Sequence, residues 1–403
     1  MLRHGVVPRL IVTQKVLDHI RDVASQFIED ETGESLIGFV LEPDDEAPNG
    51  TIVVLDTIAP DESVVRQAHM FEQGDTLQED IFLWLSSNWD VYREQQREAQ
   101  GDGFKWDVPL VHLGDWHKQP GFMIAPSGGD LHTVMQLLHD DDATLEFMLV
   151  PIVTIGHPPT ISPQNEGMMN YTLLPNGDDE HIRIDWWYIH RDGLYFQPIV
   201  PHVYKDEKLP KLVPYPWNLT NYERLNAEIQ QLRGDGLFSN VLELNVDDEL
   251  PIEICILCAR QGSDKVYILT TRWNYPEVAP RFYTAPFSEM DSNLDMYDNF
   301  WRLWEAAEEL KPPRGWRWEK DVYLIDLIRI MEETHNLLPE PEPEPLAESD
   351  DGAEERTEKP EAGDEAASQK VAIAAEGDNT ANDDAESDDE KPETAPQTEM
   401  EDD

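Results

Sequence analysis

The sequence contains little cysteine and no long apolar stretch, and each absence excludes a class of protein. Cys255 and Cys258 are the only cysteines among 403 residues, too few for a disulfide framework and typical of a reducing cytosol. The longest apolar run, Leu145 to Gly156, contains Glu146 and Pro151 and is shorter than the roughly 20 residues of a membrane-spanning helix. The start, MLRHGVVPRLIV, has no uninterrupted apolar stretch of signal-peptide length. We therefore expect a soluble cytoplasmic protein without a membrane partner.

Basic residues are also scarce. The chain has 30 Lys and Arg against 83 Asp and Glu, a formal net charge of −53. Such a charge repels nucleic-acid phosphates and anionic membrane surfaces, so nucleic acid is not an expected partner. From Glu340 onward there are 25 acidic residues, four basic ones and no aromatic residue. That composition buries too little apolar area to offset ordering entropy, so residues 339–403 are predicted to be a disordered acidic tail.

The rest of the chain predicts an α/β (α+β) protein with two domains, since about 100–200 residues form one domain. In the first domain, residues 1–204, Thr13 caps a predicted amphipathic helix that ends near Asp30, and the apolar strands SLIGFVLE and TIVVLDTIA follow. A second helix is predicted from Asp75 to Gln100, then the strand VPLVHLGDWH, a helix after PSGGD and further strands. Residues 205–219, rich in Lys and Pro, are the predicted linker to a second domain at 220–338.

One stretch of the first domain has the pattern of a zinc hydrolase. Such an enzyme needs three protein ligands around an open position and a carboxylate that takes a proton from water. Strand residues two apart share a face, so His-x-His at a strand end delivers two imidazoles to one metal. The stretch HLGDWHKQPGFMIAPSGGDLHT and the earlier ETGESLIG resemble the signature of the JAMM (JAB/MPN) metalloproteases. In that family a Glu in an E-T-G turn precedes His-x-His-Pro, seven residues, Ser, two residues and Asp.

The resemblance covers about residues 10–200 and implies a JAB/MPN mixed sheet flanked by helices. Carried over position by position, it implies that Glu31 is the general base and Ser127 a donor to the oxyanion, and that His117 and Asp130 are metal ligands. Gln119 stands where the family has its second ligating histidine. Because an amide oxygen is a poorer zinc ligand than an imidazole, Gln119 is a weak third ligand, and bound Zn²⁺ is expected to be weak or absent.

Other interpretations of these residues remain open. Glu31 fits an acidic surface turn, and Ser127 with Asp130 fits an ordinary helix cap. Asp115, two residues before His117, shares its strand face and is a possible substitute ligand, whereas His112, five residues before His117, should face away from His117. A second departure from the family is Glu34, at a position where glycine is common.

The second domain resembles the ubiquitin-conjugating-enzyme and RWD fold. The resemblance rests on RLNAEIQQL as the first helix, the turn from Tyr275-Pro276 to Pro280, and the closing helix before PEPEP. Conjugating enzymes need a thiolate nucleophile after this turn, and there is no cysteine between Pro286 and Lys320. The resemblance therefore implies an RWD-like recognition module. Cys255 and Cys258, inside the apolar run ICILCA, are predicted to be buried thiols on opposite strand faces.

Two main functions follow from the sequence. The first is a JAMM-type zinc metallopeptidase that cleaves an isopeptide or peptide bond of a conjugate of a ubiquitin-like protein, with a further protein partner for the RWD-like domain. The alternative is a non-catalytic MPN scaffold that has lost the metal, which Gln119 favours. A third possibility, an adaptor whose acidic tail binds a basic partner, rests on charge alone.

Overall fold

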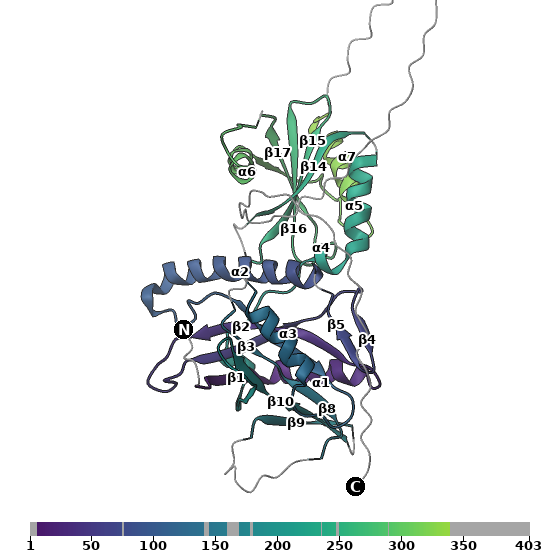
Figure 1. The fold of residues 1–403 in the computed structure, drawn as a ribbon. Helices are drawn as coiled ribbons and strands as arrows, with labels where there is room; N and C mark the ends of the chain where they lie inside the picture. The colour runs from purple at the N-terminus through teal and green to yellow at the C-terminus, as the bar shows by residue number, and fades with distance from the viewer. Residues whose placement is uncertain are drawn as a thin grey trace, which may run out of the picture. The chain divides into compact units, whose positions relative to one another are not determined.

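The structure is a computed structural model that describes residues 6–338, apart from 75, 141–144, 159–168, 178–179, 235, 247–249 and 289. The predicted acidic tail lies outside the described residues. The chain forms two large sheets, one after the other, and each is packed against helices. This confirms the α+β fold class (Figure 1). No helix of the described part is both long and apolar enough to cross a membrane.

The first sheet has eleven strands, and its main path runs in the order β12-β11-β7-β6-β2-β3-β1-β13. β8 pairs with β6 and β10, and β9 pairs with β10. The strands are β1 (Arg9–Thr13), β2 (Thr32–Leu41), β3 (Thr51–Ile58), β6 (Val111–Lys118), β7 (Phe147–Leu149), β8 (Ile152–Ile155), β9 (Tyr171–Asn176), β10 (Glu180–Asp185), β11 (Trp187–His190), β12 (Gln197–Pro198) and β13 (Pro201–Tyr204). A separate hairpin joins β4 (Val65–Gln67) and β5 (Met70–Glu72).

One face of this sheet is covered by α1 (Gln14–Gln26). The predicted cap is present, because Thr13 Oγ1 accepts a hydrogen bond from the backbone N–H of Val16 at 3.2 Å. The helix buries Val16, Leu17, Ile20 and Ala24 in a core with residues of β1, β3 and β6. The 3.6-residue spacing of these apolar positions is what made this helix predictable.

Two helices cover the opposite face. α2 (Thr76–Gln100) packs Ile81, Trp84 and Trp89 in one cluster with apolar residues of β2 and β3. α3 (Gly128–Leu138) packs Val134 and Leu138 with residues of β7, β8 and β11. The second and third helices of the predicted first domain are thus present.

The second sheet has five antiparallel strands in sequence order, β14 (Phe238–Val246), β15 (Glu253–Arg260), β16 (Lys265–Thr271), β17 (Arg281–Pro286) and β18 (Glu308–Leu310). α5 (Tyr222–Gly234) and α7 (Leu324–His335) share a cluster with one face of the sheet, and α6 (Met296–Glu305) shares one with the other (Figure 1). The predicted hairpin of β15 and β16 is confirmed. Cys255 and Cys258 are both buried and belong to different clusters, as their odd spacing predicted.

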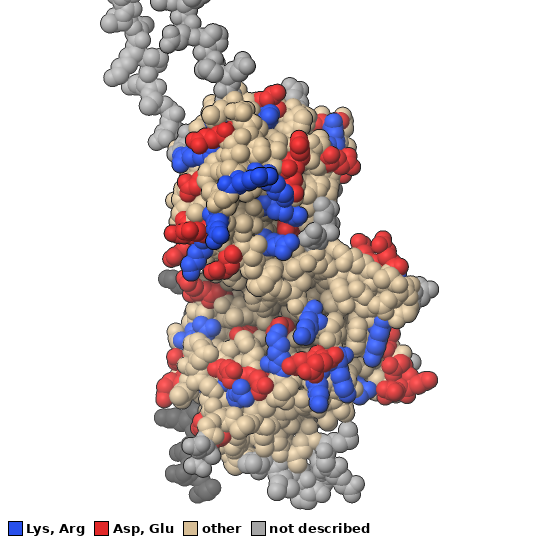
Figure 2. All heavy atoms as spheres, turned by 180° about the vertical axis from the view of Figure 1, so that it is seen from behind, with Lys and Arg blue, Asp and Glu red and all other residues tan. Residues whose placement is uncertain are grey.

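Both sheets contribute to one hydrophobic cluster, and α2 lies in it. The cluster joins Trp89 of α2 to Ile254 of β15 and to Trp217 of the short helix α4 (Trp217–Thr220). Asn88 Oδ1 accepts a 2.8 Å hydrogen bond from the backbone N–H of Ile252. The described residues up to 338 accordingly belong to one compact unit. On the face seen in Figure 2, basic side chains stand among acidic ones, so no continuous basic surface is visible there.

Candidate metal centre

The site is built where the ends of β2 and β6 pair in antiparallel register. Gly33 lies opposite His117, and Ser35 lies opposite Asp115. A Cβ atom added to Gly33 would lie 2.2 Å from the carbonyl oxygen of Trp116 and 3.1 Å from Cβ of His117. The absence of a side chain at Gly33 therefore lets the two strands approach closely enough to fix His117.

Three predicted site residues, His117, Gln119 and Asp130, have their side-chain heads together. Nε2 of Gln119 lies 3.1 Å from Nε2 of His117 and 3.2 Å from Oδ2 of Asp130. Oδ1 of Asp130 lies 3.5 Å from Nε2 of His117. His117 and Gln119 come from the end of β6, and Asp130 comes from the first turn of α3, as their spacing suggested.

Ser127 and Asp130 also form the predicted helix cap. The backbone N–H of Asp130 donates to Ser127 Oγ at 3.2 Å, and the backbone N–H of Ser127 donates to Asp130 Oδ2 at 2.5 Å. Capping does not remove Asp130 from the site, because its second oxygen still faces His117. The cap holds the Asp130 carboxylate in a fixed orientation.

The three heads form a hydrogen-bonded cluster. Two of its three distances are measured to Nε2 of Gln119, an amide nitrogen that donates hydrogen bonds and does not ligate a metal. Within the described ranges, no group of three or more His, Cys, Asp or Glu side chains is placed to hold a metal. The set found here is completed by an amide, Gln119, and its Oε1 is buried without a hydrogen-bond partner.

Burial and charge shift the proton affinity of two groups. Burial, followed by the negative charge of Asp130, raises the pKa of Glu31, which is half-buried just before β2. Burial lowers the pKa of His117 although Asp130 opposes the shift. His117 therefore favours the neutral imidazole that a metal binds, and Glu31 favours proton uptake more than an ordinary glutamate does.

His112 and Asp115, three residues apart on β6, are in contact. Nε2 of His112 lies 3.1 Å from Oδ1 of Asp115, and Ser35 Oγ donates to the same oxygen at 2.8 Å. A β-bulge between Leu36 and Ile37 of β2 and the left-handed backbone of Gly114, with φ at 130°, shift the alternation of β6 by one residue. Asp115 is thus held by Ser35 and His112.

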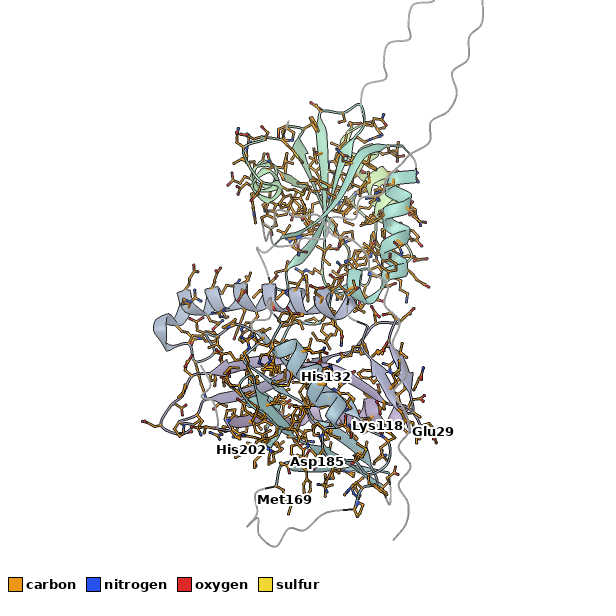
Figure 3. The ribbon with its side chains drawn as sticks, in the orientation of Figure 1. Glu29, Lys118, His132, Met169, Asp185 and His202 are labelled. Carbon is orange, nitrogen blue, oxygen red and sulfur yellow. The ribbon has the colours of Figure 1, made fainter. Side chains whose placement is uncertain are left out.

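Two further polar residues, one on β2 and one on β6, are buried, although neither had a functional role predicted from the sequence. Glu34 is buried and takes hydrogen bonds from Thr57 and His19, with a 2.9 Å contact to Nε2 of His19. Lys118, also buried, donates from Nζ to the carbonyl oxygen of Ile28 at 3.0 Å and lies close to Glu29 (Figure 3). Burial lowers the pKa of Lys118. A charged residue inside an alternating strand looks exposed, so its burial was not predictable from the pattern.

Comparison with known proteins adds little to this geometry. No protein-family model matches the chain, and no curated protein matches it. Among solved structures, the solution structure of protein DSY2949 from Desulfitobacterium hafniense is 14% identical, with a TM-score of 0.24. That match covers 49% of this chain and 96% of the other. At this level of likeness the function has to be argued from the site itself.

Proposed function

We propose that the chain is a JAMM-type zinc metallopeptidase. The observation that carries the proposal is the convergence of His117, Gln119 and Asp130 within 3.1–3.5 Å of one another, in the order and spacing of the family motif. Glu31, the fourth motif residue, lies near enough to Asp130 for the two charges to interact. The motif residues come from two segments of the sequence, Glu31 and the stretch from His117 to Asp130, and their proximity near the end of β6 supports the proposal.

The residues present suit a zinc ion, with one weak ligand. His117, Asp130 and Gln119 through its amide oxygen would hold it. A half-turn of the Gln119 amide about Cγ–Cδ exchanges its nitrogen and oxygen, and the unpartnered Oε1 then faces His117 and Asp130. When bound, zinc supplies Lewis acidity that polarises a scissile carbonyl and makes water more acidic.

The remaining chemistry belongs to the protein. Glu31, with its raised pKa, accepts a proton from the attacking water and returns it to the departing nitrogen. Ser127 Oγ accepts a hydrogen bond from the helix, which leaves its hydroxyl hydrogen available to donate to the developing oxyanion. The cap at Ser127 and Asp130 holds both groups at the start of α3.

The expected substrate is an isopeptide or peptide bond next to the C-terminus of a ubiquitin-like protein, as the resemblance implies. The RWD-like unit would then bind the conjugate or a second protein. Its only thiols, Cys255 and Cys258, lie buried on β15, and burial raises the pKa of each. This supports recognition in place of thioester chemistry in that unit.

One observation favours the second candidate, a non-catalytic scaffold. In the orientation found here, the Gln119 amide nitrogen donates to Asp130 and lies at hydrogen-bond distance from His117. The amide thereby stands between both ligands and satisfies them without a metal. A scaffold of this kind would keep the fold and the partner surface but hydrolyse nothing.

Metal analysis of the purified full chain separates the two candidates. We expect sub-stoichiometric zinc in the natural protein, zinc approaching one per chain in Gln119→His, and background zinc in His117→Ala. Glu31→Gln should keep the metal content of its parent and lose cleavage of a peptide–ubiquitin isopeptide conjugate. Cleavage by the natural protein that Glu31→Gln abolishes supports the peptidase. Zinc in Gln119→His alone, with no cleavage by the natural chain, supports the scaffold. Background zinc in both forms overturns the metal site altogether.

A further inference from the structure

The two edges of the second sheet differ in how they are protected against a further strand. β18, at one edge, is only three residues long, contains Glu308 and Glu309, and is followed by Lys311, Pro312 and Pro313. Short length, charge and proline are features that keep an edge strand from pairing with another chain. β14, at the other edge, is nine residues long and contains no lysine, arginine or proline. The unprotected edge is therefore the one to which a strand can be added.

β14 directs a row of backbone groups away from its partner β15. In an antiparallel pair, every second residue bonds to the neighbouring strand, and the residues between them face outward. The carbonyl oxygen of Asn245 accepts a 2.8 Å hydrogen bond from the hydroxyl of Tyr297 on α6, so Asn245 faces outward. The pairing is regular as far back as Asn240, and by alternation Glu243 and Val241 also face outward. Within the described ranges, no backbone group bonds to these two residues from outside the sheet.

The side chains beside this edge favour a basic residue in the added strand. Glu243 is the only charged residue of β14, and Asp80 of α2 lies near enough for the two charges to interact. Asn218 donates from Nδ2 to Oε1 of Glu243 at 2.7 Å, and its own Oδ1 is buried without a hydrogen-bond partner among the described residues. Two carboxylates and an amide oxygen are all acceptors, and a lysine or arginine side chain supplies the donors that they lack.

The positions next to Glu243 favour apolar residues in the added strand. Leu242 and Leu244 lie on the opposite face of the sheet from Glu243, half-buried against the cluster that contains Phe300. In a strand added to β14, the residue opposite Glu243 shares its face, and the residues before and after it lie on the face of the two leucines. The complementary segment therefore has a basic residue between two apolar ones.

We propose that β14 is a docking edge for an extended segment of a partner protein, with a lysine or arginine between two apolar residues. Main-chain hydrogen bonds to Val241 and Glu243 supply affinity, and the Glu243 side chain selects the basic residue. The net charge of −53 favours the approach of a basic partner. Such binding needs no metal, so it holds for the peptidase and for the scaffold alike.

Binding of short peptides to the full chain tests this assignment. The probe is an acetylated peptide with a central lysine, a valine on each side of it, and threonine and glycine beyond. One matched peptide has glutamate in place of the lysine. Another carries a methyl group on the backbone nitrogen of the lysine, which faces β14. Affinities are measured by isothermal titration calorimetry on the natural chain, on Glu243→Lys and on Glu308→Lys, a control for the change of charge on the protected edge.

We expect the natural chain and Glu308→Lys to bind the lysine peptide about fivefold more tightly than the glutamate peptide, and Glu243→Lys to reverse this order. Backbone methylation should abolish binding to the natural chain, because it removes a main-chain donor to Glu243. Equal affinity for the lysine and glutamate peptides, undiminished binding of the methylated peptide, or no binding of the lysine peptide overturns the proposal. A dimer of the natural chain that Asn245→Pro converts to monomers also overturns it, since the edge then binds a second copy.

Discussion

Nζ of Lys118 donates a 3.0 Å hydrogen bond to the carbonyl oxygen of Ile28, across the face of β6 that is opposite to His117. Lys118 therefore ties the segment that ends in Glu31 to the strand that carries two of the proposed ligands. Lys118 lies between His117 and Gln119 in the sequence, so the same short segment carries this attachment and two of the proposed ligands.

Replacing Lys118 should loosen this attachment. Lys118→Met keeps the aliphatic stem but removes the donor, and the carboxylates of Glu29 and Glu31 lose a nearby cation. We expect the free energy of unfolding in urea to fall by about 1–2 kcal/mol. Lys320→Met, at an exposed position, is the control and should change it by less than about 0.5 kcal/mol. Equal stability of the two variants would show that the Ile28 contact contributes nothing.

Gly33 should tolerate no side chain. In Gly33→Ala the new Cβ would meet backbone, the carbonyl oxygen of Trp116 at 2.2 Å, so β2 and β6 must move apart. Thermal and urea unfolding should show a loss of about 3 kcal/mol. Gly103→Ala is the matched control, since a Cβ there meets nothing within 4 Å. A Gly33→Ala protein as stable as the control would contradict the close strand approach.

The contact of His19 with Glu34 predicts a pH dependence. The hydrogen bond to Glu34 raises the pKa of His19 above its ordinary 6.5, although burial opposes the shift. A raised folded-state pKa means that the stabilisation is complete below pH 6.5 and is lost as the pH rises through the folded value. The stability difference between the natural chain and His19→Gln should thus be larger at pH 6 than at pH 9. Since His19 is half-exposed, the difference should be small, and a difference that grows toward pH 9 would reverse the assignment.

The two cysteines should be unreactive in the folded protein. Both are buried, and burial raises the pKa of each thiol, so little thiolate forms at pH 8. A thiol reagent such as dithiobisnitrobenzoate should label neither residue natively and both in guanidinium chloride. Rapid native labelling at Cys255 or Cys258 would place that thiol at the surface and reopen thioester chemistry.

The parts of the site that the sequence predicted depend on short-range spacing. His117 and Gln119 share a strand face because side chains alternate, and Asp130 follows Ser127 at the spacing of a helix cap. The contact of His112 with Asp115 was not predictable from simple alternation, because a β-bulge interrupts it, and Gly114 is the local sign of that bulge. A glycine inside a strand pattern often marks such a bulge.

The longer-range features could not be predicted in the same way. β13 pairs in parallel with β1 across about 190 residues of sequence, and no local pattern specifies that partner. No helix was predicted between the Tyr275 turn and the closing helix, yet α6 forms there, and the backbone N–H of Asp298 donates to the capping carboxylate of Asp295. The apolar run ending at Gly156 proved to be two strands, β7 and β8, broken at Pro151.

The hydrogen bond from Ile252 to Asn88 has a consequence for how this architecture is inherited. A gene fragment that encodes only the second sheet would lack α2, and it would expose the apolar surface that now faces Trp89. Such a fragment is therefore not expected to fold by itself when it is joined to another protein, in contrast to recognition domains with a complete core of their own. Relatives of this chain should therefore retain the second sheet together with α2, whether or not they keep His117 and Asp130.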